Sequence, residues 1–137
     1  MTVTASDDAG IDDVKAYYVR PQELRDAGVG HDFHIACSPT PVSTVGGTFT
    51  CTGTKTLTPD QYSGTYQINY VHLWSTEPIA PSRWSTQYMG PGSGGFLGRI
   101  EGHGRTGSVG VWGITCCHEL NMSDIVVTGH DYVPRGG

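Results

Sequence analysis

The stretch that decides the fold runs from Met89 to Gly113 and reads M-G-P-G-S-G-G-F-L-G-R-I-E-G-H-G-R-T-G-S-V-G-V-W-G. Apolar residues alternate with glycine along its second half, as they would on the two faces of a β-strand. Glycine weakens a flat strand and is used where a strand bends, bulges or passes close to another group. Repeated glycine is typical of small, strongly coiled sheets. The stretch therefore predicts a β-hairpin, from Gly95 to Gly102 and from Gly107 to Cys117, in a barrel or sandwich.

The turn of this hairpin fixes its register. With its centre near Arg105, Gly98 would pair with Trp112 and Ile100 with Gly110. The large Trp112 ring would then lie over the bare backbone of Gly98.

The composition indicates one β-rich domain. The chain has 137 residues, only 15% of them charged, with many Gly, Thr, Ser and Tyr, which suits strands better than a helical bundle. The net charge is −5 and Lys and Arg do not cluster, so we expect no nucleic-acid partner. No apolar run is long enough for a membrane partner, and the N-terminus does not read as a signal peptide. We therefore expect a cytoplasmic protein.

The N-terminal residues 1–19 carry four aspartates and few apolar residues. This predicts a flexible acidic arm, with a single β-barrel domain over residues 20–137. Pro21 and Gly28 bracket one short helix, since proline suits a first helical turn and glycine the position after the last.

The rest of the chain reads as short strands separated by turn signals. The segments with strand character, besides the two arms of the glycine-rich hairpin, are 32–37, Val45–Thr56, Thr65–Trp74, Trp84–Met89 and Ser123–Tyr132. A hairpin centred on Thr44 would place Cys37 opposite Cys51. This pattern predicts an all-β fold, a small antiparallel β-barrel of about eight strands, with a β-sandwich as the alternative.

Aromatic residues concentrate on these strands. Alternation over Thr65–Trp74 places Tyr66, Ile68, Tyr70, His72 and Trp74 on one face. Such a stripe can be core or pocket wall. The many Tyr and Trp carry polar groups, whereas a packed core prefers aliphatic residues, and this favours a pocket. The residues we expect to bind substrate are Tyr66, Trp74, Trp84, Tyr88, Phe96 and Trp112.

Three side chains are candidate catalytic groups. His72 and His118 each share a strand face with a tryptophan, and either could act as a general acid or base near neutral pH. A hydroxyl such as that of Tyr70 could polarise a carbonyl group by hydrogen bonding. For each histidine the alternative is a hydrogen-bonded structural role.

The tetrapeptide Cys116-Cys117-His118-Glu119 resembles a metal-binding sequence, but adjacent strand residues point to opposite faces and cannot enclose one ion. We therefore expect no metal and no cofactor. A Cys37–Cys51 disulfide is geometrically allowed, although a reducing cytosol favours free thiols that fill space.

The stretch G-S-G-G-F-L-G-R-I-E-G resembles the glycine-rich hairpin of allene-oxide-cyclase-like barrels, which include plant dirigent proteins and bacterial spirotetronate cyclases. Gly92, Ser93, Gly94 and Phe96 match its start and Gly102 matches a later glycine. The resemblance covers this hairpin only. It implies an eight-stranded antiparallel barrel, often oligomeric, with an apolar lumen that steers cyclisation by shape.

On this basis we expect a cofactor-independent cyclase or isomerase of natural-product biosynthesis. It would fold a small apolar or polyketide-like substrate in a barrel lumen and form a homodimer. The alternatives are a non-catalytic barrel that binds a small ligand, and a structural or assembly protein of viral or phage type.

Overall fold

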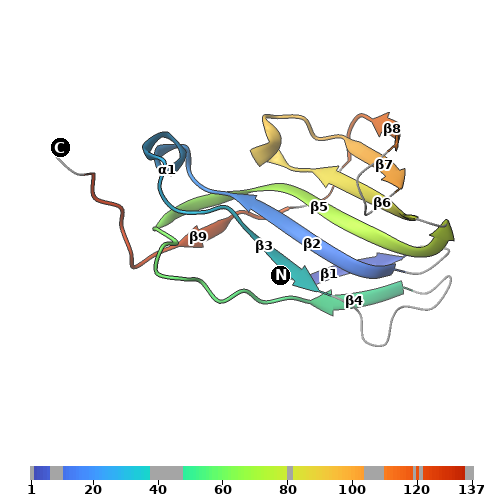
Figure 1. Cartoon of the computed structure of the whole chain (residues 1–137), viewed down its shortest axis with the longest axis horizontal. Coiled ribbons are helices and arrows are strands. Elements are labelled where there is room, and N and C mark those ends of the chain that lie inside the picture. The colour runs from blue at the N-terminus through green and yellow to red at the C-terminus, as the bar shows by residue number, and fades with distance from the viewer. Residues whose placement is uncertain are drawn as a thin grey trace.

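The computed structural model describes residues 2–6, 11–37, 48–79, 82–103, 110–118, 120 and 122–134. These residues form strands joined by one short α-helix and one 3-10 helix (Figure 1). In chain order the elements are β1 (Thr2–Ser6), β2 (Ile11–Val19), α1 (Gln22–Ala27), β3 (Phe33–Cys37), β4 (Thr48–Thr52), β5 (Gly64–Ile79), β6 (Ser82–Met89), η1 (Pro91–Ser93), β7 (Arg99–His103), β8 (Gly110–Thr115) and β9 (Ile125–Val127). The predicted all-β fold is confirmed.

The strands form a large antiparallel sheet and a small one. The large sheet has seven strands, in the order β3-β2-β5-β6-β7-β8 with β9 paired to β5. The small sheet consists of β1 and β4, which lie beneath β2 and β3 in Figure 1. Within the described residues β3 and β8 end the order without pairing with each other, so the large sheet is open and not closed into a barrel.

The predicted flexible arm is wrong for Ile11–Val19, which form the long strand β2. This strand pairs with β3 on one side and β5 on the other. Val14 and Ala16 are fully buried. The charge of the aspartates favours a flexible arm, but burial of the alternating Val14, Ala16 and Tyr18 outweighs it and stabilises the strand. The predicted domain boundary at residue 20 is therefore also wrong.

The connection from β2 to β3 contains the predicted helix. It begins after Pro21 and ends at Gly28, which has a left-handed φ of 68°, a conformation that glycine adopts without a steric penalty. Leu24 points into the core and is 2% exposed. The Arg20 guanidinium donates to the carbonyls of Val29 and Gly30 at 3.0 and 2.6 Å, which fixes the loop that leads into β3.

The sheet has a core face and an outer face. Side chains of directly opposed residues share a face, so the register defines both. The core face carries Val14, Ala16, Tyr18, Phe33, Ile35, Cys37, Ile68, Val71 and Leu73. The outer face carries Lys15, Tyr17, His34, Tyr70, His72 and Trp74. The core face packs into two hydrophobic clusters, and Val71 contacts both of them.

A β-bulge in β5 separates two halves of the predicted aromatic stripe. Tyr17 pairs with Tyr70 and Tyr18 with Ile68, so Asn69 is an extra residue opposite β2. One extra residue moves every following side chain to the other face. Tyr66 therefore joins Ile68 on the core face, while Tyr70, His72 and Trp74 lie on the outer face. The prediction of one common face is wrong because it assumed uninterrupted alternation.

The glycine-rich hairpin is present as β7 and β8, but with another register. Ile100 pairs with Ile114, not Gly110, and the pairing is irregular between Glu101 and Gly102. The ring that lies against Gly98 belongs to Phe96.

The turn predicted around Thr44 lies outside the described residues, and among those described β3 pairs with β2 while β4 pairs with β1. Cys37 pairs with Val14 and Cys51 with Val3. Cys37 is disulfide-bonded, contrary to the expected free thiol. The predicted Cys37–Cys51 disulfide involves the side chain of Cys51, which is not among the side chains that the structure describes.

Candidate functional site

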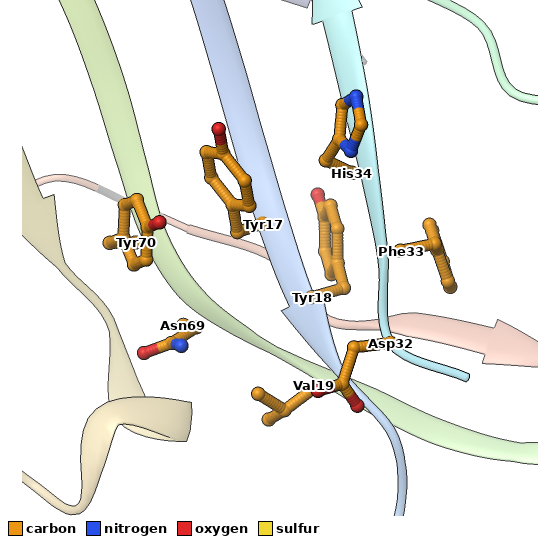
Figure 2. Close-up of a pocket in the computed structure, with 8 residues that line it drawn as sticks. All are labelled: Tyr17, Tyr18, Val19, Asp32, Phe33, His34, Asn69 and Tyr70. Atoms are coloured by element: carbon orange, nitrogen blue, oxygen red, sulfur yellow. The ribbon is translucent and has the colours of Figure 1, made fainter. Parts of the chain in front are cut away.

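Aromatic rings contact one another across three strands of the outer face. Tyr17 of β2 stands opposite Tyr70 of β5 and His34 of β3. The ring centroids of Tyr17 and Tyr70 are 4.4 Å apart and the planes are 25° from parallel. Those of Tyr17 and His34 are 5.5 Å apart at 35° (Figure 2). The register of the sheet thus builds a continuous row of stacked and tilted rings from one residue of each strand.

The same surface continues along β5. His72 lies 6.3 Å from Tyr70 and 4.3 Å from Trp74, centroid to centroid. His72 and Trp74 are 8% and 9% exposed, Tyr70 and Tyr17 are half-buried, and His34 is exposed. We call these five side chains the aromatic row. It runs from a buried end at Trp74 to an exposed end at His34.

A pocket of about 180 Å³ lies at the exposed end of the aromatic row. Its lining consists of Tyr17, Tyr18, Val19, Asp32, Phe33, His34, Asn69 and Tyr70 (Figure 2). Asn69 is the residue of the β-bulge, which explains why an amide stands next to the Tyr70 ring. The Asp32 carboxylate accepts a hydrogen bond from the backbone N–H of Arg20 at 3.0 Å. The pocket therefore combines an aromatic wall with an amide and a carboxylate.

Tyr70 lines this pocket as a protonated phenol. Burial raises the pKa of its phenol, and the nearby Tyr17, through its charge and a hydrogen bond, raises it further. At neutral pH the Tyr70 hydroxyl can therefore donate a hydrogen bond as well as accept one. Of the three predicted catalytic residues, Tyr70 and His72 lie together on the aromatic row.

His118, the third predicted catalytic residue, lies elsewhere. Its Nε2 is 2.6 Å from the carbonyl oxygen of Met89, and its Nδ1 accepts the backbone N–H of Leu120 at 3.2 Å. These two bonds select the neutral tautomer with the proton on Nε2. Its backbone N–H bonds to the Leu97 carbonyl, and its ring packs edge-on to Tyr88 at 5.6 Å. This geometry suits a structural histidine, whose hydrogen bonds connect the segments that contain Met89, Leu97 and Leu120.

The predicted substrate-binding residues do not surround one lumen. Trp74 belongs to the aromatic row. Tyr66 is fully buried in the core, and its hydroxyl donates to the Tyr62 carbonyl at 2.8 Å. Tyr88 lies beside His118, and Phe96 is an exposed loop residue. The side chains of Trp84 and Trp112 lie outside those that the structure describes.

Of the eight residues that line the pocket, only Tyr70 was predicted from the sequence, and the seven others include Tyr17, Asp32, His34 and Asn69. Tyr17 and Tyr18 stand in K-A-Y-Y-V, where alternation sends one ring to each face. Had a strand been predicted over this segment, the same alternation would have placed one of the two tyrosines on the outer face. His34 lies on the alternate positions of β3 that point away from the core. For the bulge at Asn69 the sequence holds no local signal.

The Cys116–His118 region does not continue the strand as predicted. Cys116 and Cys117 form a disulfide with each other, and Cys117 has a left-handed φ of 79°. Across the described part of the chain, no three His, Cys, Asp or Glu side chains are grouped as metal ligands. Nor is any helix in that part long and apolar enough to cross a membrane.

Comparison with protein-family models, curated proteins and solved structures finds no match to this chain. The geometry of the site therefore carries the functional argument.

Proposed function

We propose that this chain is a binding module that holds a neutral, sugar-like ring against the exposed end of the aromatic row. The observation that carries the proposal is the contact of Tyr70, Tyr17 and His34 across three strands of an accessible face. On the core face the stacked pair Tyr18 and Phe33 is 5% and 8% exposed. The core is thus filled by other rings, so the outer rings are available to a ligand.

The chemistry of the pocket supports a polyhydroxylated ring. A sugar ring presents C–H groups on its flat side, which pack against an aromatic plane, and hydroxyl groups at its edge. The Asn69 amide can donate and accept, and a carboxylate such as Asp32 accepts several hydrogen bonds. Together they suit ligand hydroxyls next to the wall formed by Tyr17 and Tyr70.

Charge favours a neutral ligand. The chain carries a net charge of −5, and Asp32 places a carboxylate in the pocket. The Arg20 guanidinium lies 3.5 Å from this carboxylate and partly offsets its charge, so repulsion of a phosphate or carboxylate group on the ligand rests mainly on the net charge of the chain. A nucleotide, which could also stack on the tyrosines, is disfavoured for the same reason.

The proposal is tested by calorimetric titration of glucose, galactose, mannose and N-acetylglucosamine into the full chain. Loss of stacking in Tyr70→Ala should weaken binding about tenfold. Tyr17→Phe keeps the ring and should bind within about twofold of the native chain. Phe96→Ala removes an exposed ring outside the pocket and should bind normally. A chain that binds none of the sugars, or an equal loss in Phe96→Ala, would contradict the proposal.

The cyclase and assembly hypotheses stay predictions. A cyclase would draw on the Tyr70 hydroxyl and His72, which lie on the same face, and would require turnover of an apolar substrate. The predicted homodimer likewise awaits measurement of the mass in solution.

A further inference from the structure

A second cavity lies on the core face, on the side of the sheet opposite the aromatic row. Its volume is about 260 Å³, and its lining consists of Thr2, Val3, Ala16, Tyr18, Ile68, Val71, Met122 and Ser123. Three layers meet there. β2 and β5 form the floor, β1 forms one wall, and the segment before β9 forms the other.

The cavity sits where the two hydrophobic clusters of the core meet. One cluster contains Ala16, Tyr18 and Ile68, the other contains Val14, and Val71 packs against both. Ala16 is fully buried and stands opposite Val71 in the register. A small side chain at this central position leaves space that a larger residue would fill.

The lining specifies the chemistry of an occupant. Its floor is apolar, because Ala16, Ile68 and Tyr18 are almost completely buried, and the half-buried Val3, Val71 and Met122 supply the accessible apolar surface. Thr2 and Ser123 are exposed lining residues with hydroxyl groups, and the Thr2 hydroxyl is also hydrogen-bonded to that of Thr52 at 3.2 Å. Burial and the charge of Asp124 raise the pKa of the Tyr18 phenol, so an anionic ligand would meet an unfavourable environment.

From this arrangement we infer a second binding site, for an uncharged bicyclic compound that carries one hydroxyl group. Its rings contact Val3, Val71 and Met122 above the buried Ala16, and its hydroxyl group lies at the mouth near Thr2 and Ser123. A cavity of about 150 Å³ lined by apolar side chains holds benzene. A volume of about 260 Å³ accommodates two fused rings. The two sites differ in every lining residue except Tyr18, which borders both.

The test uses 2-naphthol, followed by its fluorescence as it is titrated into the full chain. The native chain should bind one equivalent and unfold at a higher temperature in its presence. Ala16→Leu fills the floor of the cavity and should weaken binding at least about tenfold. The matched control Ala27→Leu adds the same side chain on the exposed face of α1 and should bind as the native chain does.

Two further variants keep the test decisive. If Ala16→Leu does not fold, Met122→Phe fills the cavity from its half-buried wall and should give the same loss. Tyr70→Ala should leave 2-naphthol binding unchanged, because Tyr70 lies on the other face. The inference is overturned if the native chain shows no saturable binding, if folded cavity-filling variants bind normally, or if Tyr70→Ala abolishes binding. The sugar titrations are unaffected by any of these results.

Discussion

Individual glycines of the glycine-rich stretch act by letting backbones approach each other. The N–H of Gly90 donates to the Asn69 carbonyl at 2.6 Å. A Cβ atom on Gly90 would lie 2.5 Å from the Ile68 carbonyl oxygen, and one on Gly92 would lie 2.9 Å from the same atom. Both glycines therefore pack on the bulge of β5, which places Tyr70 on the outer face.

At the residue scale this predicts that Gly90→Ala destabilises the fold. The methyl group would clash with backbone atoms that cannot rotate away, so the free energy of unfolding should fall by about 1–3 kcal/mol. Gly98→Ala is the control, because the atoms nearest to its Cβ belong to the Phe96 ring, which is 39% exposed and can turn. Urea unfolding measures both variants. Equal losses would contradict the assigned role of Gly90.

At the scale of elements, the bulge decides which side chains β5 offers to each face. Deleting Asn69 would restore strict alternation and turn Tyr70, His72 and Trp74 toward the core. We expect the deletion variant to be insoluble or to lack cooperative unfolding. Asn69→Ala keeps the extra residue and should fold, with its sugar affinity reduced about threefold to tenfold through the lost amide. Circular dichroism and thermal unfolding separate the two. A deletion variant that folds normally would rule out this role of the bulge.

Sequence patterns predicted the elements whose signals are local. Helix α1 follows from Pro21 and Gly28, and β3 from the alternation of Phe33, Ile35 and Cys37. The hairpin of β7 and β8 was also expected, but its register depends on an irregularity at Gly102 that no local pattern marks. Strand β2 was missed because the charge of the aspartates masked the alternation of Val14, Ala16 and Tyr18, and its two partners are set by the burial of whole faces.

The sequence likewise predicted only those residues of the candidate site that lie on one strand. Tyr70, His72 and Trp74 were found because they alternate within one strand. Their partners Tyr17 and His34 come from strands paired over long sequence separations, and they could be found only once the order β3-β2-β5 was known. A site made across strands is a property of the sheet and not of any one segment.

At the scale of the whole molecule, the sheet separates an outer aromatic layer from an inner one, and the inner layer links stability to pH. Burial raises the pKa of Tyr18 and Tyr66 above the ordinary value of 10.0. In the unfolded chain these phenols ionise near that value, while the folded chain retains their protons. The unfolded state therefore binds fewer protons, and stability must fall as the pH rises. The stabilisation is complete below about pH 10 and is lost progressively above it.

This linkage predicts a flat free energy of unfolding from pH 7 to about 9 and a steady decline above about pH 10. Tyr66→Phe loses the hydrogen bond to the Tyr62 carbonyl, so it should be less stable by about 1 kcal/mol at pH 7, yet its decline should be shallower. Ile35→Val is the control, since it loosens the same cluster without removing a titratable group or a ring that packs on the two phenols, and it should keep the native slope. Urea unfolding across this pH range measures all three chains. Parallel curves for Tyr66→Phe and the native chain would mean that the buried phenol of Tyr66 does not couple ionisation to folding.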